Sequence, residues 1–197
     1  MTQPTLRTDR LLLRPWRPDD LPTVYDIYSR WEVARYLGRT PTVLTEPAQA
    51  EASLARWAAI EGPLHGVWAI VPRGASVPVG SALLKLLPLS GSGTASGDTE
   101  IGWHLHPDAW GAGYATEAAQ GLLAHAWASG LDEVFAVTYA ENTASQAVCR
   151  RLGMTHLGPT DRYYDLTCEL FRVTAHPHRI RPDANEAAAP SAPVHRL

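Results

Sequence analysis

Residues 106–118 read HPDAWGAGYATEA, and this stretch decides what kind of fold the chain can adopt. The preceding TEIGWHLH (99–106) has the composition of a β-strand, and residues 114–129 repeat small and apolar side chains at helical spacing. A strand, a turn with Gly111 and Gly113, and then a helix form an arrangement that binds anions, because free N–H groups at a helix start point outward. No lysine or arginine lies inside the turn, so backbone amides would do the binding.

The glycine turn also admits two other interpretations. The glycines can simply permit positive φ in a tight turn. A dinucleotide-binding fingerprint would need a third glycine where Thr116 stands, and an acid at the end of the next strand, about 20 residues on. Asp132 and Glu133 have that spacing but precede the strand, which disfavours this interpretation. A structural turn and an anion site both remain open on the local sequence.

The rest of the chain alternates strand and helix patterns. Asp19 or Asp20 is expected to cap the first helix and Thr45 the third, whereas residues 90–98 (SGSGTASGD) are expected to form a flexible surface loop. The order predicts an α/β protein with a mixed sheet and helices on its faces. Strands are expected at 10–16, 66–72, 77–89, 99–106, 133–140, 154–158 and 164–175, and helices at 19–30, 31–38, 45–62, 114–129 and 142–152.

Composition narrows the class of protein. The 197 residues are 45% hydrophobic and 19% charged, which suits one globular domain over residues 1–176. Residues 177–197 are rich in Pro and Ala and are expected to form a mobile tail. No apolar run approaches the roughly 20 residues of a membrane span, and a net charge of −3 argues against direct nucleic-acid binding. Cys149 and Cys168 form no CxxC pair, so we expect a reduced, cytoplasmic protein, with a single disulfide left open.

Four segments together resemble one known family. They are TDRLLLRPWRPDDL (8–21), EVARYLG (32–38), TEIGWHLHPDAWGAGYATEA (99–118) and ENTASQAVCRRLGM (141–154). In this order they resemble the GNAT superfamily of N-acetyltransferases over about residues 6–175, and more narrowly its RimJ/RimL-like branch of ribosomal-protein N-terminal acetyltransferases. Trp110 departs from the Gln or Arg of the wider superfamily, and Met154 stands at a usually aromatic position.

The resemblance implies the GNAT fold, a mostly antiparallel sheet splayed at the cofactor site with helices on both faces. It implies acetyl-CoA as co-substrate and no metal. The pantetheine arm would pair with backbone groups of Leu105 and His106 and with the amide of Asn142. The diphosphate would rest on the N–H groups of Gly111, Ala112, Gly113, Tyr114 and Ala115.

Catalytic roles follow from the same resemblance. Ser145, three positions after Asn142, is expected to protonate the leaving thiolate, with a helix cap or a pantetheine contact as the alternative. Cys149 occupies the place of the tyrosine of the wider family and is expected only to pack. Glu100 is the candidate base, against a solvated strand-end carboxylate or a water chain. Tyr164 and Asp165 are expected to border the acceptor pocket, against a purely structural hairpin role.

The activity that the resemblance implies is transfer of an acetyl group from acetyl-CoA to a primary amine, by direct attack in a ternary complex. The amine is either the N-terminal α-amine of a protein or peptide, or a small molecule. The alternative is a catalytically silent acyl-CoA-binding regulatory module. Dimers are common among relatives, so a homodimer is possible.

Histidines and aromatic residues give weaker signals. His104 and His106 share one strand face, but no third ligand stands at usable spacing for zinc, and His176, His178 and His195 suit a solvated tail better than a metal site. The aromatic side chains of the early helices either wall the acceptor site or belong to the core; they are Trp31, Tyr36 and Trp57.

Overall fold

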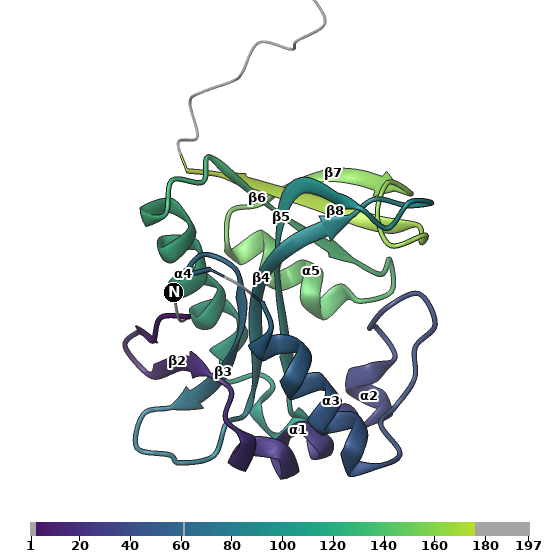
Figure 1. Cartoon of the computed structure of the whole chain (residues 1–197). Helices are drawn as coiled ribbons and strands as arrows, with labels where there is room; N and C mark the ends of the chain where they lie inside the picture. The colour runs from purple at the N-terminus through teal and green to yellow at the C-terminus, as the bar shows by residue number, and fades with distance from the viewer. Residues whose placement is uncertain (1–2, 61, 176–197) are drawn as a thin grey trace, which may run out of the picture.

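Figure 1 shows the computed structural model of the chain, in which residues 3–60 and 62–175 are described. The expected tail at 177–197, which includes His178 and His195, lies outside the described residues, and so does His176. Among the described residues, no helix combines the length and apolarity that crossing a membrane requires.

One eight-stranded sheet organises the fold, in the order β1-β2-β3-β4-β5-β6-β8-β7. All neighbouring strands are antiparallel except β5 and β6, which run parallel. The predicted mixed sheet is therefore confirmed, and it is mostly antiparallel. The strands are β1 (Leu6–Arg7), β2 (Leu11–Pro15), β3 (Gly66–Pro72), β4 (Gly80–Pro88), β5 (Ala95–Leu105), β6 (Glu133–Thr138), β7 (Thr155–Thr160) and β8 (Cys168–Thr174).

The sheet opens between its two central strands. β5 and β6 share a single registered pair, Glu100 with Phe135, and beyond it the strands diverge. Figure 1 shows β5 turning away from β6 toward the end of the molecule where the early helices lie. The backbone groups along this stretch of β5 are consequently left without a neighbouring strand on one side.

Helices cover both faces of the sheet. The helix α4 packs against β1, β2, β4 and β5, whereas α1 and α3 pack on each other and α3 also contacts β3 (Figure 1). The main core lies under α4 and includes Leu13, Trp68, Leu84 and Leu122, all fully buried. The helices are α1 (Leu21–Tyr28), α2 (Trp31–Ala34), α3 (Pro47–Ala58), α4 (Tyr114–Ala128) and α5 (Thr143–Arg151).

One of the two expected helix caps lies at the predicted position. Asp20 is the N-cap residue of α1, but its carboxylate makes no cap hydrogen bond there; it accepts from both terminal nitrogens of Arg14 at 2.7 and 2.9 Å. This pairing wins because Arg14 is itself buried and an unpaired buried guanidinium is costly. Thr45 lies one position too early, since Glu46 is the N-cap of α3.

The region expected as a flexible loop at 90–98 is partly strand. β5 begins at Ala95, which pairs with Pro88 across a β-bulge in β4. The Ser- and Gly-rich sequence did not predict this pairing, because glycine in particular has a low intrinsic preference for strands. Pairing with β4 holds these residues in the strand conformation.

Candidate active site

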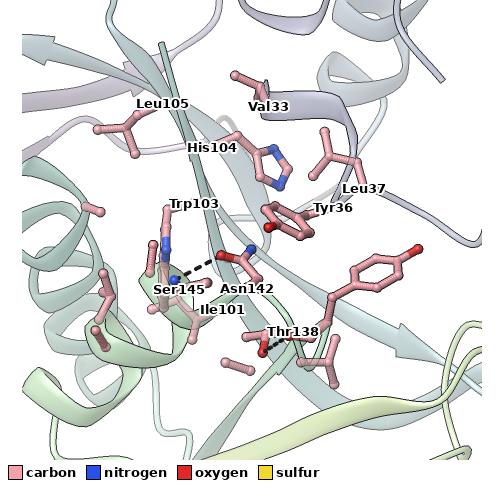
Figure 2. A pocket seen from close by; sticks show the side chains of 18 of the residues that line it. Val33, Tyr36, Leu37, Ile101, Trp103, His104, Leu105, Thr138, Asn142 and Ser145 are labelled. Carbon is pink, nitrogen blue, oxygen red and sulfur yellow. Dashed lines mark hydrogen bonds between the residues drawn. The ribbon is translucent and has the colours of Figure 1, made fainter. Parts of the chain in front are cut away.

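A cavity of about 840 Å³ lies where β5 and β6 diverge (Figure 2). Its walls come from β5, β6, the glycine turn, the start of α5 and the segment around α2. Of the sequence-predicted site residues, the lining ones are Glu100, Leu105, Gly111, Gly113, Tyr114, Ala115, Asn142, Ser145 and Tyr164. His106, Ala112 and Asp165 are not among the lining residues. The splay of the sheet thus brings most of the predicted site together.

The glycine turn has the geometry of an anion cradle. Gly111 and Gly113 have φ of +75° and +80°, the left-handed region that favours glycine. Gly113 is the N-cap of α4, and the first helical bond runs from Glu117 N to Gly113 O at 3.1 Å. The backbone amides that precede Glu117 in this first turn therefore have no acceptor within the helix. The same turn lines the cavity. A diphosphate fits such a site because both the free N–H groups and the helix dipole favour negative charge.

Trp110 joins the turn to the end of β5. Its indole Nε1 donates to the carbonyl of Leu105 at 2.9 Å, and about half of the Trp110 side chain is exposed at the cavity. The departure from the Gln or Arg of the wider superfamily thus has a structural role here.

Arg10 contacts the glycine turn, which the sequence interpretation did not predict. Its guanidinium donates through Nη1 to the carbonyl of Ala112 at 3.0 Å and through Nε to Glu117 at 2.6 Å. A Cβ added to Gly113 would lie 3.3 Å from Nη2 of Arg10. A positive charge therefore lies beside the turn although none lies inside it. Glu117, an acid in the first turn of α4, was the only sequence signal for such a partner.

The pleat of β5 decides which backbone groups face the opening. The amide of His106 donates to Val79 O at 2.9 Å on the β4 side, and its carbonyl accepts from Ala109 at 2.9 Å. Along a strand, the backbone N–H and C=O groups of successive residues point alternately toward one neighbouring strand and away from it. The backbone groups of Trp103 and Leu105 therefore point away from β4, toward β6. The backbone groups of His106 are therefore engaged within the chain, contrary to the expectation, and those of Trp103 face the opening.

Asn142 and Ser145 lie together at the start of α5. Asn142 is the N-cap, and its side-chain oxygen accepts from the amide of Ser145 at 3.1 Å (Figure 2). This leaves the NH₂ group of Asn142 to donate elsewhere. The hydroxyl of Ser145 lines the cavity and has no hydrogen-bond partner within residues 3–60 and 62–175.

Glu100 is held in a small polar cluster. Its carboxylate accepts a short hydrogen bond from the hydroxyl of Tyr164 and lies 3.6 Å from Nζ of Lys85. Burial, and then the neighbouring Glu100 charge, raise the pKa of Tyr164 well above its usual range, so the phenol stays protonated and donating. Glu100 is thus an ordered, nearly buried carboxylate and not a solvated strand end.

Asp165 has a structural position. Its carboxylate accepts from the amide of Gly91 at 2.6 Å and lies 3.8 Å from Arg39. Tyr164 and Asp165 both have positive φ, of 63° and 53°, so this segment is a specific, strained turn. Of the predicted pair, only Tyr164 reaches the cavity.

Several alternatives from the sequence are resolved by burial. Cys149 is fully buried in the main core, as expected, and burial raises the pKa of its thiol to about 12. The ring of Trp57 packs at tilted angles against those of Trp16 and Tyr28 and belongs to the packing of the early helices. Trp31 is exposed and lies outside the cavity. Tyr36 alone of the three aromatic candidates lines the cavity. In the described part of the chain, no three His, Cys, Asp or Glu side chains are grouped as metal ligands.

Comparison with known proteins agrees with this geometry. The model of the acetyltransferase (GNAT) domain family matches residues 10–155. The uncharacterized N-acetyltransferase YoaA of Bacillus subtilis is 27% identical over 162 residues, which cover 81% of this chain and 88% of YoaA. Among solved structures, an acetyltransferase from Agrobacterium tumefaciens is 27% identical with a TM-score of 0.67, covering 88% of this chain and 95% of its own.

A further solved structure shares the fold at lower identity. RimL, a ribosomal L7/L12 alpha-N-protein acetyltransferase in complex with coenzyme A, has a TM-score of 0.69 at 16% identity and covers 87% of this chain and 98% of its own.

The fold and the site define an enzyme that transfers an acetyl group from acetyl-CoA. The chain belongs to the GNAT family of acetyltransferases.

Proposed function

We propose that the protein acetylates a primary amine by direct attack on acetyl-CoA in a ternary complex, as enzymes of the RimJ/RimL-like branch do. The acceptor is the N-terminal α-amine of a protein or peptide, or a small-molecule amine. The observation that carries this proposal is the open edge of β5. This edge, the glycine turn and Ser145 all line the same cavity.

The chain supplies distinct groups along this edge. The first-turn amides of α4 would hold the diphosphate, while Trp103 and Leu105 would pair with the pantetheine arm as a neighbouring strand does. The carbonyl of Leu105 already accepts from Trp110, so its N–H and the groups of Trp103 are the ones available. The NH₂ group of Asn142 would add a side-chain donor to the arm.

Acetyl-CoA supplies a thioester whose carbonyl carbon is open to attack by an amine. A backbone N–H of β5 that faces the opening would stabilise negative charge on the thioester oxygen. Ser145 would give a proton to the departing sulfur, because its hydroxyl lines the cavity and is not engaged by other side chains. Glu100, already bound by Tyr164 and Lys85, would shape the acceptor end of the cavity.

The shared fold with RimL supports the choice of a protein N-terminus as one acceptor. The alternative of a silent acyl-CoA-binding module has one structural argument in its favour. Cys149, at the place of the tyrosine of the wider family, is buried outside the cavity and cannot reach the thioester.

Release of free thiol from acetyl-CoA distinguishes the two functions. The purified protein is mixed with acetyl-CoA and a panel of amines, including peptides with free and with blocked N-termini. The enzyme releases thiol with at least one free amine and with no blocked one. Tight binding of acetyl-CoA in calorimetry without release for any acceptor contradicts the proposal and supports the module.

A further inference from the structure

A buried chain of hydrogen bonds ends at the imidazole of His104. Nδ1 of His104 lies 3.0 Å from the hydroxyl of Tyr28, which in turn donates to the hydroxyl of Ser81 at 2.9 Å. Tyr28 comes from α1, Ser81 from β4 and His104 from β5, and the rings of Tyr28 and His104 meet edge to face. Three separate elements therefore hold this imidazole in one orientation.

The same chain favours one tautomer of His104. A phenol has one proton, and with that proton directed to Ser81 the oxygen of Tyr28 accepts from Nδ1–H. In a neutral imidazole the other nitrogen then carries a lone pair. Burial, followed by the Lys85 charge, lowers the pKa of His104 to about 4, so the ring is neutral at physiological pH. Nε2 is consequently a hydrogen-bond acceptor.

His104 lies next to the backbone groups at which we propose that the thioester binds, so its Nε2 is close to the reacting centre. His104 lies between Trp103 and Leu105, the two residues whose backbone groups face the opening. Its side chain lies on the opposite face of β5 from the α4 core and lines the cavity. Figure 2 shows the ring beside Tyr36 and Leu37, at the wall formed by the segment around α2.

We propose that Nε2 of His104 accepts an N–H of the attacking amine, and that Tyr28 and Ser81 are positioning residues that set its tautomer and orientation. The proposal rests on the proposed function. The contact would direct the nitrogen lone pair toward the thioester on the neighbouring edge. Glu100 is less suited to this task because Tyr164 and Lys85 already engage its carboxylate.

The step balances with the groups present. The amine nitrogen bonds to the thioester carbonyl carbon, the carbon–sulfur bond breaks, and its electron pair leaves with sulfur. Forming the new bond makes the nitrogen cationic and its proton acidic, so a neutral imidazole can receive that proton and pass it to solvent. Sulfur takes one proton from Ser145, which regains one from solvent. The products are an N-acetyl amine and free coenzyme A.

Two coenzyme A analogues test the contact without knowledge of the acceptor. Both carry S–CH₂–C(=O)–N in place of the thioester and the amine; one ends in NH–CH₃ and the other in N(CH₃)₂. Calorimetry on the full-length wild type should give at least tenfold tighter binding of the NH–CH₃ analogue. His104→Asn, which has no polar atom at the place of Nε2, should bind both analogues within twofold of each other. His104→Gln, whose amide reaches that place, should keep part of the preference.

Further variants test the positioning residues and the fold. Tyr28→Phe should weaken the preference several-fold and shift the ¹⁵N resonance of Nε2, because the tautomer is no longer imposed. Binding of coenzyme A itself and the circular dichroism spectrum should stay unchanged in His104→Asn and His104→Gln, which separates lost contact from lost fold.

Two results overturn the proposal: no preference in the wild type, or a full preference in a folded His104→Asn. If the wild type shows the preference but releases no thiol with any amine, the His104 contact holds and the proposed transferase activity fails.

Discussion

Arg10 and Glu117, 107 positions apart in the chain, meet at the glycine turn with an Nε to Oε2 distance of 2.6 Å. Glu117 also accepts from the hydroxyl of Thr8 at 2.6 Å and from the amide of Arg10 at 2.7 Å. Burial raises the pKa of Glu117, but these hydrogen bonds and the Arg10 charge outweigh it and lower the pKa below its usual value. The start of the chain is thereby tied to the start of α4.

Substitution of the two partners should have unequal effects. Glu117→Ala should lower the free energy of unfolding by about 2 kcal/mol, because Thr8 and the Arg10 amide lose their acceptor. Arg10→Ala should cost less than about 1 kcal/mol, since half of its side chain is exposed and the ion pair is screened. Urea unfolding of both variants measures the difference. Equal losses would mean that the ion pair, and not the hydrogen bonds to Thr8 and the backbone, provides the stability.

Gly113→Asp tests the anion cradle. The new carboxylate crowds the turn and repels a diphosphate, so acetyl-CoA affinity should fall at least 100-fold, which is about 2.7 kcal/mol. Gly130→Asp is the matched control, because Gly130 also has positive φ, at +88°, and lies outside the cavity. Calorimetry on both variants measures the affinities. Unchanged binding by Gly113→Asp, or equal loss in the control, would contradict the cradle.

Ser145→Ala tests the proposed proton donor. Loss of the hydroxyl should lower kcat by roughly 10²-fold, as expected for a general acid, and leave acetyl-CoA affinity nearly unchanged. The amide of Ser145 still donates to Asn142 in this variant, so α5 keeps its cap. Cys149→Ser is the companion, expected to reduce stability but not kcat because Cys149 lies in the core. A fall in affinity with kcat preserved would make Ser145 a pantetheine contact instead.

The buried pair of Arg14 and Asp20 should dominate the acid sensitivity of the early helices. Burial raises the pKa of Asp20, but the Arg14 and Arg17 bonds and charges prevail and lower it overall. Stability from this pair is therefore present above the unfolded pKa of about 3.9 and is lost as pH falls through the lower folded value. Asp20→Asn should cost about 3–5 kcal/mol at pH 7, because it leaves a buried guanidinium unpaired. Thermal unfolding at pH 7 checks the cost, and a loss below 1 kcal/mol would place the pair in solvent.

His104 should give the opposite pH dependence to a salt-bridged histidine. Its folded pKa of about 4 lies below the unfolded value of 6.5, so the unfolded state binds more protons between them. Stability is then complete above pH 6.5 and decreases as pH falls toward 4, by up to about 1.4 kcal/mol per pH unit. Thermal unfolding from pH 7.5 to 5 should show a smaller slope for His104→Asn than for the wild type. His65, whose pKa burial also lowers, contributes equally to both proteins. Parallel slopes would show that His104 is solvated.

The sequence alone predicted most of the elements and the glycine turn at which we propose that the cofactor binds. The strand, glycine turn and helix at 99–129 are local features, because positive φ at Gly111 and Gly113 and an uncapped helix start need no distant residue. The spacing from Asn142 to Ser145 likewise predicted two neighbouring side chains at one helix start, since the N-cap and the third helical residue are always close. Periodicity predicted the central strands, but it failed at Ala95, where a partner strand orders residues of low strand preference.

Only the tertiary structure decided which groups lie at the cavity and at the glycine turn. The pleat turned His106 away from the opening and Trp103 toward it, and that choice depends on the register between β4 and β5. Arg10 joined the glycine turn, and Tyr28 with Ser81 oriented His104, through contacts between residues far apart in the chain. Such contacts have no local signature, because they arise when packing of whole helices and strands buries polar groups that must then find partners.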